Sequence, residues 1–283
     1  MLKYLKYYIP ALTGILAIIF FSMGQNYPTY FCIAWSLFVI IGDHLLPRDM
    51  EIQQFSHPAI LNTSIYVNLP ILVCLMFLVV SIFGDNASNL YIEELYSSFN
   101  IDFYQIKDSF TLIDQIAIIL QTTLFIGILG TVPGHELTHR KQNKFDMFVG
   151  NWLLAFSWDC TFAIEHVYGH HKNACLDEDP ASAKRGENIY LFIIKATIDE
   201  QKSGWKIESE RLKRRKLKFF SSENGMLVGY LRSLIITVLA YTFGGLIGML
   251  TFILCALLAK SFLEAINYIE HYGLVREKGK EVN

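Results

Sequence analysis

The motif His135-Glu136-Leu137-Thr138-His139, followed by Glu165-His166-Val167-Tyr168-Gly169-His170-His171, decides how this sequence is interpreted. Five of the eight histidines of the chain fall within these two short stretches. On a helix, His135 and His139 lie one turn apart on the same face, so both imidazoles can reach one metal ion. His166 and His170 repeat this spacing, and His171 adds a further donor. The pattern therefore predicts a metal site built from two helical motifs.

A sixth histidine, His271, lies far along the chain in Asn267-Tyr268-Ile269-Glu270-His271-Tyr272-Gly273. Imidazole binds iron, copper, nickel and zinc, so the histidines alone do not name the metal. Six donors exceed the four positions of a tetrahedral zinc site, which favours two metals. The predicted ligands are His135, His139, His166, His170, His171 and His271. The two remaining histidines, His44 and His57, are interpreted as ordinary surface or core residues.

Carboxylates beside the histidines are candidates for orienting the imidazoles through hydrogen bonds to their second ring nitrogen. We predict this role for Glu136 and Glu270, and it is also open to Glu165 and Glu264. Each of them has an alternative role as a surface or helix-pairing charge.

The composition is that of an integral membrane protein. Of the 283 residues, 53% are hydrophobic and only 18% are charged, with a net charge of −2. Such a profile is unlike that of a soluble domain. The five cysteines form no C-x-x-C pair and are interpreted as buried small side chains, and nothing resembles a nucleic-acid-binding module.

Six apolar stretches, each close to the length that a bilayer requires, are predicted to be transmembrane helices. They cover about 9–23, 30–46, 65–83, 116–132, 227–243 and 246–263, the last two being hinged at Gly244-Gly245. Residues 147–164 are also apolar, but they include Asn151, Trp158 and Asp159, which are unfavourable in lipid. We interpret 147–164 as a re-entrant or interfacial helix that does not cross.

The distribution of basic residues predicts the orientation in the membrane. With the N-terminus inside, the inner segments are 1–8, 47–64, 133–226 and 264–283. Every Lys and Arg except Lys107 then lies in an inner segment or near the inner end of a span, which is a strong positive-inside bias. The sequence therefore predicts a multi-pass protein of the inner (cytoplasmic) membrane, with both termini and all histidine motifs on the cytoplasmic face.

A membrane zinc metalloprotease is the main alternative from the residues alone. His-Glu-x-x-His is a protease motif in which the glutamate acts as general base, and residues 135–139 match it. That hypothesis explains neither the second motif nor His271, so we rank it below a two-metal oxidase.

Three motifs resemble those of one enzyme family. They are Gly134-His135-Glu136-Leu137-Thr138-His139-Arg140, Glu165-His166-Val167-Tyr168-Gly169-His170-His171 and Asn267-Tyr268-Ile269-Glu270-His271-Tyr272-Gly273-Leu274. Together with Glu178-Asp179-Pro180-Ala181-Ser182-Ala183 and Arg185-Gly186-Glu187-Asn188-Ile189-Tyr190, they resemble the integral-membrane alkane 1-monooxygenase (AlkB-type) family. This family belongs to the membrane fatty-acid desaturase and hydroxylase superfamily.

The resemblance implies a non-haem centre of two iron ions that uses O2 to hydroxylate the terminal methyl group of an alkane or a similar apolar chain. It also implies rubredoxin and a rubredoxin reductase as electron donors. Fatty-acid desaturation and xylene-type hydroxylation remain alternatives. The family carries a further box of three histidines downstream, so we expect residues 1–283 to be a single membrane-bound hydroxylase domain that is truncated at its C-terminus.

A basic run from Arg211 to Lys218 follows the second motif in sequence. It is suited either to docking an acidic donor protein or to lying against anionic membrane lipid, and we favour lipid.

Overall fold

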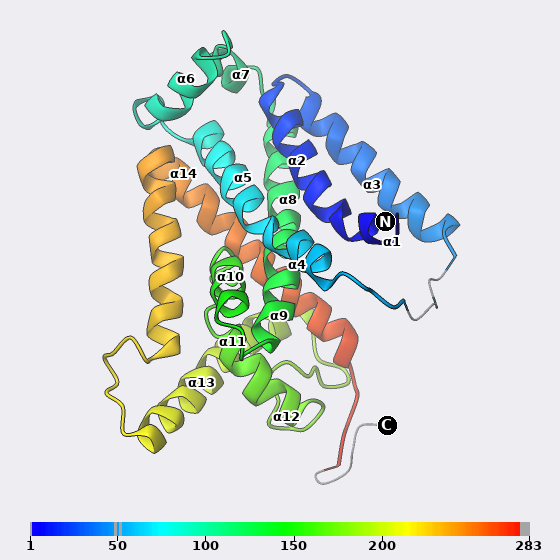
Figure 1. Ribbon diagram of the computed structural model, residues 1–283, viewed down its shortest axis with the longest axis vertical. Coiled ribbons are helices and arrows are strands. Elements are labelled where there is room, and N and C mark those ends of the chain that lie inside the picture. Colours follow the sequence, from blue (N-terminus) through cyan, green and yellow to red (C-terminus); the bar gives the residue numbers. More distant parts are fainter. Residues whose placement is uncertain (1, 48–49, 51–52, 278–283) are drawn as a thin grey trace. The chain divides into compact units, whose positions relative to one another are not determined.

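The computed structural model describes residues 2–47, 50 and 53–277, and within them the chain is all-helical, with no β-strand (Figure 1). Residues 1, 48–49, 51–52 and 278–283 belong to the predicted inner segments and lie outside the described residues. The prediction of an all-α membrane protein is confirmed.

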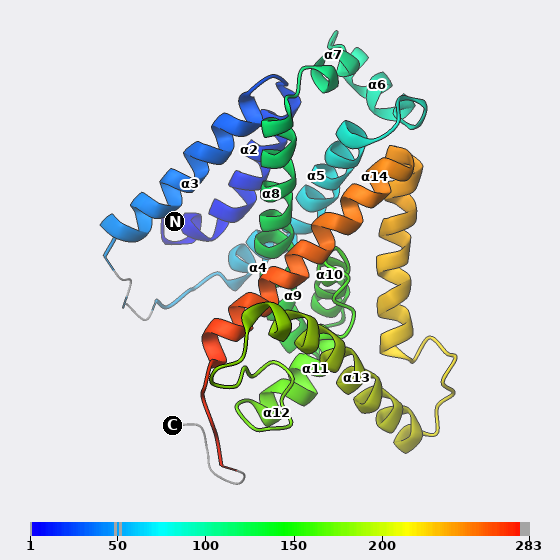
Figure 2. The ribbon, with the colours of Figure 1, turned by 180° about the vertical axis from the view of Figure 1, so that it is seen from behind.

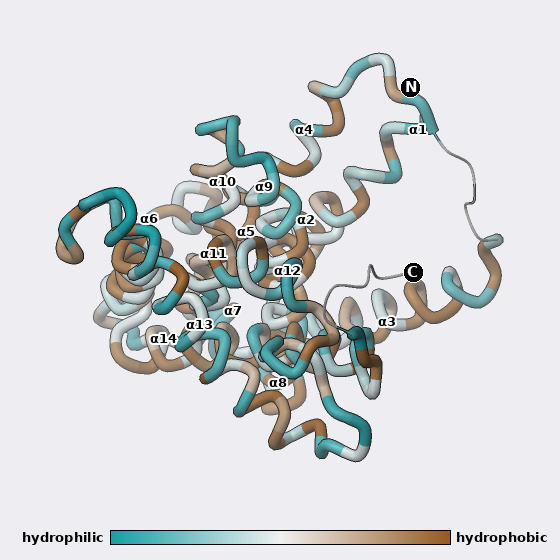
Figure 3. The backbone as a smooth tube through the Cα atoms, turned by 90° about the horizontal axis from the view of Figure 1, so that it is seen from below, coloured by the Kyte–Doolittle hydropathy of each residue, from teal (hydrophilic) through white to brown (hydrophobic). Residues whose placement is uncertain are grey.

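Five helical stretches are long and apolar enough to cross a membrane: Lys3–Ser22, Tyr27–Leu45, Pro58–Phe83, Leu112–His139 and Gly225–His271. Their apolar residues appear brown in Figure 3, in contrast to the hydrophilic α12 (His171–Asn173). The last two of the six predicted spans both lie in the 47-residue α14 (Gly225–His271), so the six predicted spans fall within five helical stretches. Gly245 interrupts α14 with the non-helical dihedrals φ 60° and ψ −160°.

The described residues cluster into two compact units, the first of which comprises 1–129 and 238–255. In it α2 (Ile9–Ser22) packs against α3 (Tyr27–Leu45) and α5 (Asn68–Phe83), and α8 (Leu112–Phe125) packs against α3 and α5. The remaining helices of this unit are α1 (Leu2–Leu5), α4 (Pro58–Tyr66), α6 (Leu90–Ser97) and α7 (Phe103–Asp108), with short 3-10 turns at Lys6–Tyr8 and Asn86–Ser88.

Glycines allow α14 to turn back on itself beside α5. The bend is visible in Figure 1 where the yellow-orange part of α14 meets the orange part. The dihedrals of Gly245 lie in a region that only glycine adopts without strain. A Cβ at Gly244 would collide with the carbonyl oxygen of Val80, and one at Gly248 would lie 2.6 Å from the same oxygen. Small residues spaced in this way let two membrane helices approach closely.

Gly244→Ala is expected to lower the free energy of unfolding by about 1–3 kcal/mol, because the added methyl group must displace backbone. Gly127→Ala is the matched control, since a Cβ at Gly127 would meet no atom within 4 Å. Thermal unfolding of both variants in the same detergent measures the difference. Equal melting temperatures for the two variants would show that the contact with Val80 is not tight.

The second unit comprises 130–237 and 256–283, and it contains all six predicted ligands. In this unit α9 (Val132–His139) packs against α10 (Lys144–Ala155), with Gly134 and Gly150 at the contact. The long α13 (Ile189–Arg215) lies along α11 (Phe162–Glu165) and the π-helical turn η4 (His166–His170), as Figure 2 shows. The stretch 147–164 is broken after Ala155 and is not among the five candidate spans, and its interpretation as a non-crossing segment stays a prediction.

Candidate metal centre

The first histidine motif forms the C-terminal part of a helix, as predicted. His135 and His139 lie on α9, and their ring centroids are 4.8 Å apart. The six-residue π-helical stretch η3 (Ile126–Thr131) precedes α9, and Pro133 follows it. Proline cannot donate a backbone hydrogen bond to the preceding turn. A widened turn before Pro133 is a way for the chain to continue as a helix, and such π-helical insertions are frequent at functional sites.

The second motif is not a regular α-helix. Residues His166–His170 form a π-helical turn in which the backbone N–H of His171 donates to the carbonyl of His166. In a π-helical turn the i→i+5 hydrogen bond brings residues five apart toward the same face, whereas on an α-helix they would diverge. The ring of His166 therefore lies 5.2 Å from that of His170 and also 4.5 Å from that of His171. This turn directs all three imidazoles of the motif to one region.

The two motifs meet. One ligand nitrogen from each of His135, His139, His166 and His171 lies within 4.8 Å of the others. The Nε2 atoms of His135 and His166 are 2.9 Å apart. Two imidazole nitrogens bound at 2.0–2.1 Å to a single ion such as zinc lie roughly 3 Å apart, so this spacing fits donors that share a metal.

Burial favours the neutral form of these imidazoles, which is the form that binds metals. For His166, burial and the charges that its neighbours would carry, His135 first, lower the pKa to about 2. Burial and the nearby His139 also lower the pKa of His171. Both rings therefore keep their lone pairs available near neutral pH.

His170 is turned toward a different partner. Its Nδ1 lies 3.1 and 3.0 Å from the two carboxylate oxygens of Asp179. Burial alone would lower the pKa of His170, but the hydrogen bond and the charge of Asp179 outweigh burial and raise it. Asp179 also accepts hydrogen bonds from the Ser182 hydroxyl and from the Ala181 backbone N–H. With Nδ1 held in this way, Nε2 of His170 is the atom left for a metal.

His271 comes close to this second position. Its ring centroid lies 4.9 Å from that of His170, and its Nδ1 lies 3.0 Å from the carbonyl oxygen of Asn267. Donation from Nδ1 to this carbonyl leaves Nε2 of His271 available. The structure thus divides the six predicted ligands into a group of four and the pair His170 and His271, and the ring contact between His166 and His170 joins them.

The carboxylates predicted to orient imidazoles have other partners. The side chain of Glu136 is 56% exposed and pairs with Arg140 at 2.7 Å, and Glu270 is exposed. Glu165 accepts from the Ser203 hydroxyl at 3.0 Å, and burial raises its pKa to about 7. The carboxylate of Asp179, by contrast, hydrogen-bonds the imidazole of His170. The exposed position of Glu136 also argues against a protease in which it would be the general base.

Asp179→Asn is expected to weaken metal binding about 10–100-fold, the usual effect of removing a carboxylate that orients a histidine ligand. Asp177→Asn is the control, because Asp177 is exposed and pairs only with Lys184 among the described residues. Titration with a chelator, followed by metal analysis, measures both affinities. Equal affinities for the two variants would show that Asp179 does not support a ligand.

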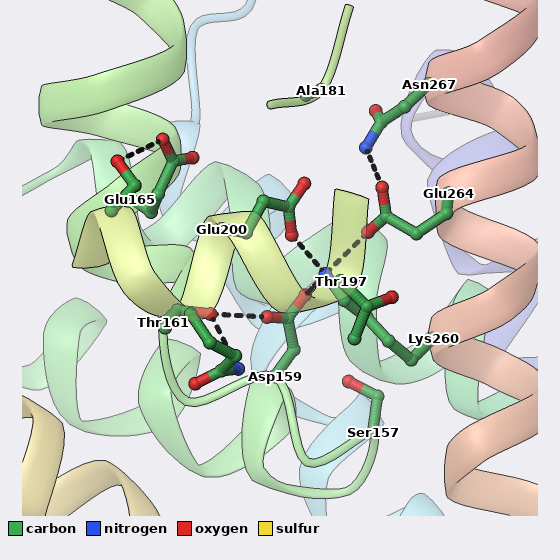
Figure 4. Close-up of polar contacts among 12 residues, drawn as sticks. Ser157, Asp159, Thr161, Glu165, Ala181, Thr197, Glu200, Lys260, Glu264 and Asn267 are labelled. Atoms are coloured by element: carbon green, nitrogen blue, oxygen red, sulfur yellow. Dashed lines mark hydrogen bonds and ion pairs between the residues drawn. The ribbon is translucent and has the colours of Figure 1, made fainter. Parts of the chain in front are cut away.

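A buried ionic cluster lies near the histidines in the same unit (Figure 4). The Lys260 ammonium lies 3.0 Å from Asp159, 2.7 Å from Glu200 and 2.6 Å from Glu264, and all four residues are buried. Glu264 also accepts from the Asn267 amide at 3.2 Å. Glu264 therefore pairs with lysine and asparagine. This agrees with the alternative role predicted for it, a helix-pairing charge.

A small polar cavity separates this cluster from the histidines. It has a volume of about 10 Å³ and is lined by residues that include His166, His170, Glu200 and Asn267. This volume is close to the smallest that holds one water molecule. Sequence reasoning missed both Asp179 and Lys260 as parts of this region, although the motif Glu178-Asp179-Pro180 was among those that carried the resemblance.

Comparisons with known proteins agree with this arrangement. The model of the fatty acid desaturase family matches residues 115–282, which include all three histidine motifs. Alkane 1-monooxygenase 1 of Pseudomonas aeruginosa is 38% identical over 164 residues, covering 58% of this chain and 42% of that protein. Alkane 1-monooxygenase of Acinetobacter baylyi is 36% identical over 225 residues, covering 72% and 54%.

A further relative matches almost the whole chain. The xylene/toluene monooxygenase hydroxylase component XylM of Pseudomonas putida is 28% identical over 277 residues, covering 96% of this chain and 68% of that protein. The chain spans about half the length of the alkane 1-monooxygenases that it matches. It belongs to the fatty acid desaturase family, and the predicted resemblance to integral-membrane alkane 1-monooxygenases within it is confirmed.

Proposed function

We propose that this chain forms the metal-binding membrane core of a monooxygenase that hydroxylates a methyl group of an apolar substrate. The observation that carries the proposal is the meeting of His135, His139, His166 and His171, with His170 and His271 beside them. The similarity to alkane 1-monooxygenases supports the reaction type.

We propose two iron ions as the cofactor. The donor set fits them, because imidazole is a common iron ligand and six donors exceed the needs of one tetrahedral site. His135, His139, His166 and His171 would hold one ion, and His170 and His271 would contribute to the second. Asp179 and the Asn267 carbonyl hold the two imidazoles of the pair in the tautomer that presents Nε2.

When bound, the iron centre would supply the oxidant for the reaction RH + O2 + 2e⁻ + 2H⁺ → ROH + H2O. The residues of the chain hold the imidazoles in place, and burial keeps His166 and His171 neutral. The burial that lowers the pKa of His166 also limits the water that reaches the centre. Exclusion of water protects a reactive centre from side reactions.

The proposed substrates are alkanes or similar apolar chains, which dissolve in the bilayer and reach the protein from lipid. Methyl groups of alkyl-aromatic compounds are a second candidate class, because the relative that matches nearly the whole chain is a xylene/toluene monooxygenase component. Rubredoxin and its reductase are proposed as electron donors. The positive-inside distribution of Lys and Arg supports a site on the cytoplasmic face of the inner membrane.

Metal analysis of the purified chain tests the proposal. We expect about two iron ions per chain, whereas one zinc ion per chain would favour the protease and overturn the proposal. His271→Ala is expected to lose iron, because it removes a ligand from the pair with His170. A protease that uses only residues 135–139 would keep its metal in this variant. His57→Ala, at an exposed histidine outside the cluster, is the control.

A further inference from the structure

A second cavity, distinct from the histidine centre, lies in the same unit. It has a volume of about 350 Å³, which is within the usual range for ligand pockets. Its walls come from α10, α11, η4, α13 and the first turns of α14. The wall is partly apolar, with Met147, Ile164, Ile207 and Val228 among its residues.

The charged residues of this cavity are mainly basic. Four cations line it, Lys141, Arg211, Arg215 and Arg232, together with the single carboxylate of Glu208. That carboxylate is already engaged, because Arg211 donates to both of its oxygens at 2.7 Å and the Gly225 backbone N–H donates at 2.6 Å.

None of the other three cations forms an ion pair within the described part of the chain, although the charge of Arg215 contributes to lowering the pKa of Glu208. The Lys141 Nζ is buried without a hydrogen-bond acceptor among the described residues and lies 3.1 Å from the centre of the Tyr168 ring. Arg215 and Arg232 form no hydrogen bond or ion pair within the described part of the chain. The Lys141 ammonium is buried and Arg232 is half-buried, whereas Arg215 is exposed at the rim of the cavity. A buried cation without an anion is costly, so the inner part of the cavity favours an anionic ligand. The arginine fork in particular matches phosphate oxygens.

The cavity lies where an apolar helix begins. Arg232 is seven residues into α14, or about 10 Å along the helix from Gly225. Its neighbours Leu231 and Leu234 are 54% and 49% exposed, so apolar surface flanks the charge. An anion with attached acyl chains fits this combination better than a small soluble anion does.

Aromatic residues flank the basic run from Arg211 to Lys218, beside the cavity. Trp205 stacks with Phe219 and with Tyr230, at centroid distances of 5.5 and 5.9 Å, and the neighbouring Phe220 is 83% exposed. Tryptophan, tyrosine and exposed phenylalanine gather where membrane and water meet. Together with the basic run from Arg211 to Lys218, they place the mouth of the cavity at the level of lipid headgroups.

We propose that this cavity binds the phosphate of one anionic phospholipid, with Lys141, Arg215 and Arg232 as its cationic partners. The site is separate from the proposed catalytic function and does not depend on it. Its occupant would stabilise the contacts among α10, α13 and the start of α14.

Binding of short-chain lipids to the purified chain in neutral detergent tests this proposal. The probes are dihexanoyl phosphatidylglycerol, dihexanoyl phosphatidylcholine and inorganic phosphate, followed by calorimetry at fixed salt. We expect one saturable phosphatidylglycerol site per chain and weaker binding of the other two probes. In the double variant Arg215→Gln with Arg232→Gln, the affinity should fall at least about tenfold, because charge-assisted hydrogen bonds are lost.

The matched control is Lys213→Gln with Arg214→Gln, which removes the same charge from the same region but not from the cavity. Its affinity should stay within about twofold, because neither Lys213 nor Arg214 lines the cavity. An equal loss in both double variants would indicate diffuse attraction and overturn the proposal. The single variant Lys141→Gln, expected to weaken binding, carries the test if the pocket double variant does not fold.

Two further outcomes would also overturn the proposal. Phosphate binding as tight as phosphatidylglycerol binding would assign the cavity to a free anion. Saturable binding of an acidic carrier protein that requires Arg215 and Arg232, without a lipid site, would assign it to a protein partner.

Discussion

Replacing His166 with alanine is expected to empty the metal centre and abolish hydroxylation. The ring of His166 lies 4.4 Å from that of His135 and 4.5 Å from that of His171, and it stacks on His170. It therefore belongs to the group of four and also connects this group to the pair. Losing an orienting partner alone costs about 10–100-fold in metal affinity, so losing this ligand should cost more than about 100-fold.

Metal content by mass spectrometry and methyl hydroxylation with a reconstituted electron donor measure the effect of His166→Ala. The control is His44→Ala, because His44 is exposed at the end of α3 and is not one of the clustered histidines. We expect its metal content and its activity to equal those of the original chain. Full metal content together with normal activity in His166→Ala would contradict the proposed site, whereas full metal content with lost activity would contradict only the assignment of His166 as a ligand.

Lys260→Met is expected to cause the largest loss of stability, about 3–5 kcal/mol, because removing one partner leaves buried charges unpaired. Three carboxylates, Asp159, Glu200 and Glu264, converge on the ammonium and have little access to solvent (Figure 4). They come from the loop before α11, from α13 and from α14. The variant should therefore separate these elements, and denaturant unfolding in detergent should show a lowered midpoint.

Lys202→Met is the control for this prediction, because Lys202 pairs with Asp199 at the surface and is 71% exposed. Such a pair is worth at most about 1 kcal/mol. Adding Glu200→Gln to Lys260→Met removes one of the unpaired charges and should restore part of the stability. If Lys260→Met unfolds at the same denaturant concentration as Lys202→Met, the four groups do not form a tightly coupled cluster.

Local patterns in the sequence predicted much of the architecture. Apolar stretches of about bilayer length predicted the helices, because a helix satisfies all of its own backbone hydrogen bonds in lipid. The last two predicted spans lie on either side of Gly245, whose non-helical dihedrals bend α14 at the predicted hinge, so the six predicted spans fall within five helical stretches. The spacing of His135 and His139 predicted a shared face correctly, because α9 is an ordinary α-helix.

Other features depended on contacts between distant residues. The spacing of His166, His170 and His171 does not reveal a π-helical turn, which depends on how η4 packs against α13. In the sequence, Asp179 is one acidic residue among several. Only the fold of its loop brings its carboxylate to His170. The sequence predicted that Glu136 orients an imidazole, but on α9 its side chain pairs with Arg140 and is exposed to solvent.

The sequence by itself determined that this protein is a helical membrane protein with six histidines suited to metals. These properties follow from hydropathy, from helix periodicity and from the ligand chemistry of imidazole, all of which are local. Only the tertiary structure decided that four histidines form one group and two another, that Asp179 orients His170, and that Lys260 gathers three carboxylates. Such pairings depend on distances between side chains that are far apart in the chain, and the packing of the helices sets those distances.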